Sequence, residues 1–538
     1  MRQGDHLRGG GRKSPRSVCV SVIRPVLFSL LALSLSAAPP RLVVEETTIG
    51  QVHAAFQNHT MTCRALVDTY LARIARYDDQ GPRLNAISSV NPEAKAEAAR
   101  LDQAFADRGL TGPLHCVPVI VKDNIQTAGW ETTAGSLALK GFVPDRDAIA
   151  ITRLKNAGAI ILAKANMPDL ALNALATVNL IHGATRNPYA LDRVPAGSSG
   201  GTAVAVAANF GLVGLGMDTG NSVRGPAAHA SLVGIRPSLG LTSGAGLIPL
   251  DAQSDTVGPM ARTVEDAAIV LDVLVGHDPA DPSTEILRQW PVQPSMLATA
   301  ADGLDGIRIG VLRQAYQGGN LHLDPQIARV FANALNDLNS LGAEVVDSVS
   351  VDFVPRVPGT EACHGLKYDL NAFLDQQEAR APVSSLAAII ASGKFHPSVA
   401  DDMRALNAIN SEGDGSNACR LAKAYREAVA TALSDEMLRL HLDVLIYPTW
   451  SQLPQLTSQI TVEEAGQSLR FATSSGFPAL TVPMGFTPDA LPIGLSFLSR
   501  SWSEVGLIRV GYAYEQATRH RRPPVLAPPI PCVCGDVR

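Results

Sequence analysis

The sequence lacks several patterns that would assign it quickly to a class of protein. It contains no HExxH or paired CxxC spacing of the kind that binds zinc, no internal repeat and no heptad run. No basic cluster follows residue 24 and the formal net charge is −5, which argues against a nucleic acid partner. Charged residues make up only 18% of the chain and hydrophobic residues 46%, so the composition is that of a folded globular protein.

Long hydrophobic runs are also scarce. The apolar stretch over residues 26–38 has thirteen residues, and a helix needs about 20 to cross a bilayer, so we expect no membrane span. Six basic residues precede it, and Ser34 and Ser36 supply small side chains for cleavage after Ser36. This order is typical of a secretory signal. We therefore predict a signal peptide over residues 1–38 and an exported protein, periplasmic or secreted; an apolar N-terminal helix of a cytoplasmic protein is the alternative.

Cysteines are few. Seven occur, and six remain once Cys19 is removed with the predicted signal. An even number in an oxidising compartment permits disulfides, although spacing alone does not give the pairing. Buried, reduced thiols are the alternative. The six are Cys63, Cys116, Cys363, Cys419, Cys532 and Cys534.

Helix and strand patterns alternate along the rest of the chain. Residues 62–78 repeat apolar side chains at helical spacing, and residues 92–109 begin with proline and end with glycine, as a helix does. The run "VPVIV" at 117–121 is wholly apolar, as a strand covered on both faces would be. Residues 277–304, rich in Pro, Asp and Ala, are the best candidate for a loop. Such alternation predicts an α/β fold with a mostly parallel or mixed sheet. Further helix or strand patterns lie at 148–167, 327–351, 443–448 and 479–486.

Serines stand among glycines in residues 195–226, as a nucleophile would. Residues 197–201 match the GxSxG nucleophile elbow around Ser199, but that motif needs a strand before it, and Pro188 and Pro195 exclude a central strand there. A Ser-His-Asp hydrolase is therefore not predicted. The glycines could instead cradle a phosphate, but the Walker lysine is absent.

Ser222 has the better setting for a nucleophile. A strand pattern over 212–218 leads into the turn "TGN", where backbone N–H groups can converge on a developing oxyanion. No histidine precedes Ser222 in this region, so the base must lie elsewhere. Lys122 closes the apolar run at 117–121, and burial would lower its pKa enough for it to act as a neutral base. The ordinary alternative is an exposed solubilising charge.

Five segments together resemble the amidase signature family, and the similarity extends over about residues 45–525. It implies an α/β fold with a single large amidase-signature domain over 45–525, whose mixed central sheet is covered by helices on both faces. A flexible C-terminal tail would follow over 526–538. The segments begin with "LHCVPVIVKDNIQ", "TRNPYALDRVPAGSSGG", "DTGNSVRGPAAHASLVG", "GPMARTVEDAAIV" and "GFPALTVPMGF".

The resemblance implies a Ser-cisSer-Lys triad. Neutral Lys122 would take a proton from Ser198, which takes one from Ser222 as that oxygen attacks an amide carbonyl; water then hydrolyses the acyl-enzyme to a carboxylate and an amine or ammonia. A cis peptide bond would precede Ser198. No metal ion and no cofactor is implied. The oxyanion hole would be formed by backbone N–H groups of Thr219, Gly220, Asn221 and Ser222, with Ser199, Asp218 and Arg224 in support.

One departure from the family lies inside this predicted site. The family usually has two glycines before the nucleophile, whereas this chain has Gly220 and Asn221. Asparagine is the non-glycine residue that best tolerates a left-handed conformation, so we expect the turn to persist and the Asn221 amide to face the substrate, a small-molecule or peptide amide. Two other functions are open: the A-type subunit of a glutamine amidotransferase acting on charged tRNA, if the signal is spurious, and a catalytically silent amide-binding protein, which the intact triad disfavours.

Two further departures concern cysteine. Cys63 stands where the family commonly has serine, and Cys116 replaces the glycine that usually precedes the lysine strand. One bridge explains both departures more economically than two independent changes, so we predict a Cys63–Cys116 disulfide. Cys363 and Cys419 are the next candidate pair, and Cys532 and Cys534 lie in the predicted tail.

Overall fold

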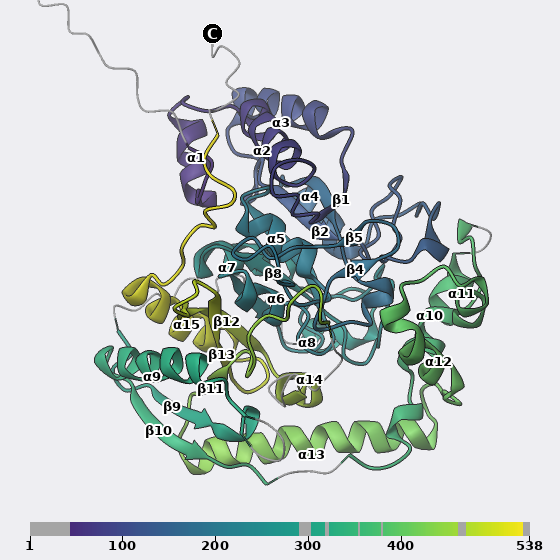
Figure 1. Cartoon of the computed structure of the whole chain (residues 1–538), viewed down its shortest axis with the longest axis vertical. Coiled ribbons are helices and arrows are strands. Elements are labelled where there is room, and N and C mark those ends of the chain that lie inside the picture. Colours follow the sequence, from purple (N-terminus) through teal and green to yellow (C-terminus); the bar gives the residue numbers. More distant parts are fainter. Residues whose placement is uncertain are drawn as a thin grey trace, which may run out of the picture. The chain divides into compact units, whose positions relative to one another are not determined.

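A computed structural model of the chain describes residues 43–289, 303–317, 322–352, 356–377, 380–460 and 470–530 (Figure 1). The predicted signal peptide, together with Cys532 and Cys534, lies outside these residues. Within the described part, no helix is both long and apolar enough to cross a membrane.

The fold is built on a mixed sheet of 11 strands. In chain order these are β1 (Ile87–Val90), β2 (Pro118–Lys122), β3 (Ile160–Ala165), β6 (Val213–Asp218), β7 (Val233–Arg236), β8 (Thr256–Ala261), β9 (Arg308–Leu312), β10 (Glu344–Val349), β11 (Val444–Pro448), β12 (Ala479–Phe486) and β13 (Pro492–Leu498). The spatial order is β1-β3-β2-β6-β8-β7-β12-β13-β11-β9-β10. The short strands β4 (Val178–Asn179) and β5 (Gly183–Ala184) pair separately. Both parallel and antiparallel pairs occur, so the predicted mixed sheet is confirmed.

The helices pack against this sheet or against one another. They are α1 (Ile49–Gln57), α2 (Cys63–Tyr77), α3 (Ala94–Arg108), α4 (Ile149–Asn156), α5 (Gly200–Ala207), α6 (Arg224–His229), α7 (Val264–Leu274), α8 (Ile286–Gln289), α9 (Pro325–Ser340), α10 (Gly365–Gln376), α11 (Leu386–Ser392), α12 (Ala400–Ala408), α13 (Asn417–Arg439), α14 (Arg470–Ser475) and α15 (Glu504–Thr518). Every residue of β2, β3, β6 and β8 is buried, which requires cover on both faces of the sheet.

Local sequence explains why the predicted helices form where they do. The side chain of Thr62 accepts a hydrogen bond from the backbone N–H of Ala65 and so caps α2. Apolar residues at helical spacing bury one face of α2, in agreement with the prediction for 62–78. The described part of the predicted loop at 277–304 is different, because it contains the short helix α8.

Strand β2 carries Lys122 into the interior. It lies between β3 and β6 and is parallel to both. Its apolar residues are fully buried, as the run "VPVIV" predicted. The strand therefore delivers a lysine to the carboxyl end of three neighbouring parallel strands, the edge at which α/β folds place their functional groups.

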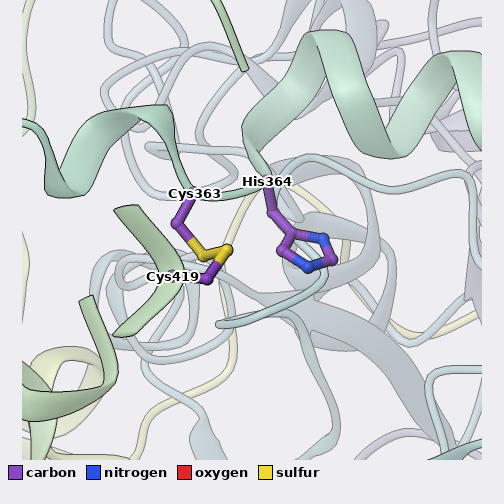
Figure 2. A group of neighbouring side chains, drawn as sticks. All are labelled: Cys363, His364 and Cys419. Atoms are coloured by element: carbon purple, nitrogen blue, oxygen red, sulfur yellow. A yellow bond between two sulfur atoms is a disulfide. The ribbon is translucent and has the colours of Figure 1, made fainter. Parts of the chain in front are cut away.

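Both predicted cysteine pairs lie at disulfide distance. The Cα atoms of Cys63 and Cys116 are 5.7 Å apart, and those of Cys363 and Cys419 are 4.5 Å apart. Figure 2 shows the second bridge with His364 beside it. Potential ligand atoms of these three residues lie within 4.8 Å of one another. A sulfur that is bonded to another sulfur is not a thiolate, so the oxidised pair does not offer a metal site.

The Cys63–Cys116 bridge is expected to stabilise the fold. It closes a sequence separation of 53 residues, and in the chain-entropy model such a cross-link adds about 3–4 kcal/mol to the free energy of unfolding. We expect reduction to lower the free energy of unfolding by that order, measured by urea denaturation of the Cys363→Ala/Cys419→Ala variant with and without reductant. This comparison keeps both side chains in place and changes only the bond. Equal stability of the two forms would contradict the prediction.

The first residues of the predicted tail contact the main body of the fold. Backbone carbonyls of Ala527 and Pro528 accept hydrogen bonds from the buried guanidinium of Arg73 on α2. The N–H of Ile530 donates to a carboxylate oxygen of Glu45. These contacts hold the chain to α2 through Arg73 and to the segment before α1 through Glu45, as far as Ile530.

Candidate active site

Lys122 is buried and directly bonded to a second residue of the predicted triad. Its Nζ lies 2.7 Å from Ser198 Oγ and 3.3 Å from the backbone carbonyl oxygen of Met217 on β6. The lysine has no exposed surface, so it is not the solubilising charge that a lysine at a strand end usually provides. Among the described residues, Ser198 is the residue whose hydroxyl bonds Lys122. A proton can pass in either direction between the amine and this hydroxyl.

The surroundings of Lys122 favour its neutral form. Burial, the largest influence, lowers the pKa of Lys122 to about 7, while the carboxylates of Asp255 and Asp218 act in the opposite direction. An amine with this pKa is partly deprotonated near neutral pH, as a general base must be. The predicted role of Lys122 therefore has a physical basis.

The loop before α5 holds Ser198 in place. The Gly197–Ser198 peptide bond is cis, as the resemblance implied. A Cβ atom at Gly197 would lie 2.2 Å from the carbonyl oxygen of Asn173, so only glycine fits there. Ser199 precedes α5, and its backbone N–H donates to the carbonyl oxygen of Ser222 at 3.2 Å. The loop that carries Ser198 is thus bonded to the loop that carries Ser222.

The turn before Ser222 is anchored by a buried charge cluster. Asp218 is the last residue of β6, and its carboxylate forms ion pairs with the guanidinium groups of Arg224 at 3.2 Å and Arg236 at 3.1 Å. All three side chains are inaccessible to solvent. Burial alone would raise the pKa of Asp218, but the two guanidinium groups lower it to about 2. The Asp218 carboxylate also accepts a hydrogen bond from the N–H of Val223. These bonds fix both ends of residues 219–222.

Ser222 lies in this turn with 4% of its surface exposed. Among the described residues, no hydrogen bond joins the Ser198 and Ser222 side chains; the link between their loops is the backbone bond from Ser199. The structure therefore brings Lys122 and Ser198 into direct contact and holds Ser222 on the adjoining turn.

Asn221 differs from the prediction made for it. We expected a left-handed conformation, but neither Gly220 nor Asn221 has a positive φ, so the turn needs no glycine there. The Asn221 side chain is buried, and within the described residues neither atom of its amide has a hydrogen-bond partner. It packs near Gly225 on α6, where a Cβ atom would lie 2.8 Å from Asn221 Nδ2.

Sequence reasoning missed Asp255. Its carboxylate accepts a hydrogen bond from the hydroxyl of Thr219 at 2.5 Å, and of the two carboxylates that act on Lys122 it has the larger effect. The residue precedes β8, which pairs antiparallel with β6 so that Thr256 lies opposite Asp218. No local pattern marks Asp255; only the pairing of these two strands would have placed it beside the turn.

Comparison with known proteins gives a consistent family assignment. The family model described as Amidase matches residues 65–508. A probable amidase of Arabidopsis thaliana is 32% identical over 506 residues, covering 89% of this chain and 92% of the relative. The A-type subunit of the glutamyl-tRNA(Gln) amidotransferase of Nitratidesulfovibrio vulgaris is 36% identical over 469 residues, covering 84% of this chain and 93% of the relative.

Solved structures agree. The native peptide amidase from Stenotrophomonas maltophilia superimposes with a TM-score of 0.80 and 36% sequence identity, covering 90% of this chain and 99% of that chain. An amidase family protein from Bacillus anthracis gives a TM-score of 0.78 with 31% identity, covering 89% of this chain and 92% of that chain.

Proposed function

Because this chain belongs to the amidase family and is an amide-hydrolysing enzyme, we propose that it cleaves a carboxylic amide through an acyl-enzyme on Ser222, with Lys122 as base and Ser198 as relay. One observation carries the proposal: a fully buried lysine amine lies 2.7 Å from the hydroxyl of Ser198. A buried amine bonded to a serine hydroxyl is the arrangement that a serine hydrolase without histidine needs.

The proton moves along this chain of groups in both directions. Neutral Lys122 takes the hydroxyl proton of Ser198, and Ser198 takes that of Ser222 as the Ser222 oxygen bonds to the amide carbonyl carbon. The C–N bond then breaks, and the same proton returns through Ser198 to the leaving nitrogen. A water molecule attacks the acyl-enzyme by the same route and releases the carboxylate. Backbone N–H groups of residues 219–222 would stabilise the oxyanion in both steps.

We propose a linear amide as substrate, with peptide amides as the first class to test. The likeness to a peptide amidase at 36% identity over nearly its whole length supports this order of testing. A panel of aliphatic, aromatic and peptidyl amides, assayed for released amine or ammonia, would identify the class. Absence of any turnover, together with no adduct on Ser222, would contradict the proposed activity.

We also propose that the protein is exported, on the strength of the apolar run at 26–38 and the basic residues before it. N-terminal sequencing of the protein from its native host tests this. A mature chain beginning within residues 37–39 would support export, and an intact Met1 would contradict it.

A second candidate is the A-type subunit of a glutamine amidotransferase. The 36% identity to such a protein favours it. The two functions differ in what they release: the amidotransferase component would hydrolyse glutamine to supply ammonia to a partner enzyme. Glutamine turnover that depends on a co-expressed partner would support this function, whereas peptide-amide turnover by the isolated chain would support the amidase.

Hydrolysis is expected to increase with pH. Burial lowers the pKa of Lys122 to about 7, and only the neutral amine can accept a proton. The rate should therefore rise as the pH passes through about 7, where the amine loses its proton, and reach a plateau on the alkaline side. The measurement is the pH profile of kcat/KM from about pH 5 to about pH 10. A rate that falls from pH 6 to pH 8 would contradict Lys122 as the base.

A further inference from the structure

Asp255 lies at the centre of a hydrogen-bonded loop beside the predicted oxyanion turn. One of its carboxylate oxygens accepts from the hydroxyl of Thr219 at 2.5 Å. The other accepts from the backbone N–H groups of Leu250 at 2.9 Å and Asp251 at 3.2 Å. Each of these partners is a donor, so the charged form of the carboxyl satisfies all of them. The bonds join the loop over residues 250–255 to the turn that begins at Thr219.

The same loop is held from its other side by α10. The backbone N–H of Ala252 donates to Asp369 at 2.9 Å, and Asp369 also binds the imidazole Nδ1 of His364 at 2.7 Å. His364 follows directly after the Cys363–Cys419 bridge, as Figure 2 shows. The loop is thus bonded to α10 through Ala252, and the Asp255 carboxylate is held within it by the N–H groups of Leu250 and Asp251.

Two carboxylates act on Lys122, and they differ in whether a positively charged side chain is paired with them. Asp255 and Asp218 are the carboxylates that favour its charged form. Asp218 is already paired with Arg224 and Arg236. Among the described residues Asp255 forms no such ion pair; its partners are hydroxyl and N–H groups. The amine of Lys122 bonds the carbonyl oxygen of Met217 on β6, and Met217 pairs with Val257, two residues after Asp255. Burial raises the pKa of Asp255 to about 7, and the charge of each group affects the protonation of the other.

We propose that Asp255 is a positioning residue of the active site, which fixes the oxyanion turn through Thr219 and sets the pH at which Lys122 loses its proton. The inference rests on the proposed function, since it takes Lys122 as the base and residues 219–222 as the oxyanion hole. It predicts two separable effects: one from the hydrogen bond to Thr219 and one from the negative charge.

Asp255→Asn tests the charge. Asparagine has the same shape, its oxygen can accept from the N–H groups of Leu250 and Asp251, and its amide can donate to Thr219, whose hydroxyl also accepts. We expect the acid midpoint of Ser222 phosphonylation by a fluorophosphonate, which releases fluoride, to move to lower pH by on the order of one unit, because a nearby opposite charge shifts a pKa by about that much. The readout is the labelling rate from about pH 5 to about pH 10, measured by intact-protein mass spectrometry.

Asp251→Asn is the matched control. It removes a carboxylate from the same loop, but the Asp251 side chain bonds Gln253 and Ser254 rather than Thr219. Asp251 does not act on Lys122 directly, but its charge helps to raise the pKa of Asp255. We therefore expect the midpoint of Asp251→Asn not to move to lower pH. A midpoint that moves equally in both variants, or in neither, would overturn the proposed effect of Asp255 on Lys122.

Thr219→Val and Thr219→Ser test the hydrogen bond without changing charge. The valine variant loses the hydroxyl, and its labelling rate should fall by at least ~10-fold while the pH midpoint stays unchanged. Complete loss of one oxyanion donor lowers the rate by about 10²–10³-fold, and a donor that is only displaced should have a smaller effect. The serine variant should recover the rate. Equal rates for Thr219→Val and the wild type would overturn the positioning role, even if Asp255→Asn fails to fold. Failure of the wild type to label at Ser222 would instead contradict the proposed function itself.

Discussion

Replacement of Ser222 by alanine is expected to abolish amide hydrolysis while the protein remains folded. The Ser222 oxygen alone would form the acyl bond, since the other hydroxyl on the turn after β6, that of Thr219, is bonded to Asp255. Removal of the nucleophile from a serine hydrolase typically lowers kcat by about 10³-fold or more, to about the residual rate supplied by binding and the oxyanion hole. The fold should tolerate the change, because the Ser222 bond to Ser199 uses the backbone carbonyl rather than the side chain.

The measurement is kcat on the best amide of the panel, together with mass spectrometry after fluorophosphonate treatment. The wild type should carry one adduct on Ser222, and Ser222→Ala should carry none. Ser199→Ala is the matched control, since Ser199 lies in the same site but its predicted role is support; its adduct should remain on Ser222. A label on Ser199 with Ser222 spared would overturn the assignment.

The parts of the fold that the sequence predicted correctly are those set by local pattern. Strand β2 was evident because five consecutive apolar residues are unusual outside a buried strand. Helix α2 was evident because apolar residues repeat at helical spacing over 62–78. In both, the physical cause lies within a few residues of the element itself. The triad needed more than pattern, because Lys122 and Ser198 are 76 positions apart and only the family resemblance placed them together.

The features that the sequence missed depend on contacts between distant segments. Asp255 reaches Thr219 across 36 positions because β8 returns antiparallel to β6, and the sequence contains no signal for the register of that pair. The turn at Asn221 was expected to persist because asparagine tolerates a left-handed conformation, but no positive φ occurs at Gly220 or Asn221, and Asp218 beside the turn is paired with Arg224 on α6 and Arg236 on β7. Helix α8 lies within a segment whose composition favoured a loop. In each of these, tertiary context outweighed local preference.

Removal of the amine of Lys122 is expected to have the second-largest effect on catalysis. Lys122→Ala should lower kcat by about 10²–10⁴-fold, the usual contribution of a general base, and Ser198→Ala should do the same. The double variant should be little worse than either single one, because the two groups transfer one proton and act as a unit. Rates of the two single variants and the double variant, measured at about pH 8, give the coupling directly. Losses that multiply would mean that the residues act independently.

Lys122→Arg separates the two ways in which a lysine could serve this site. Arginine keeps the positive charge and hydrogen-bond donors but does not lose its proton in proteins. If Lys122 acts as a neutral base, as its burial and the pKa of about 7 indicate, then Lys122→Arg should be as inactive as Lys122→Ala at every pH from about 6 to about 10. If the lysine serves only as a fixed cation beside Ser198, the arginine variant should keep most of its activity. Near-normal rates in Lys122→Ala at alkaline pH would show that another group accepts the proton.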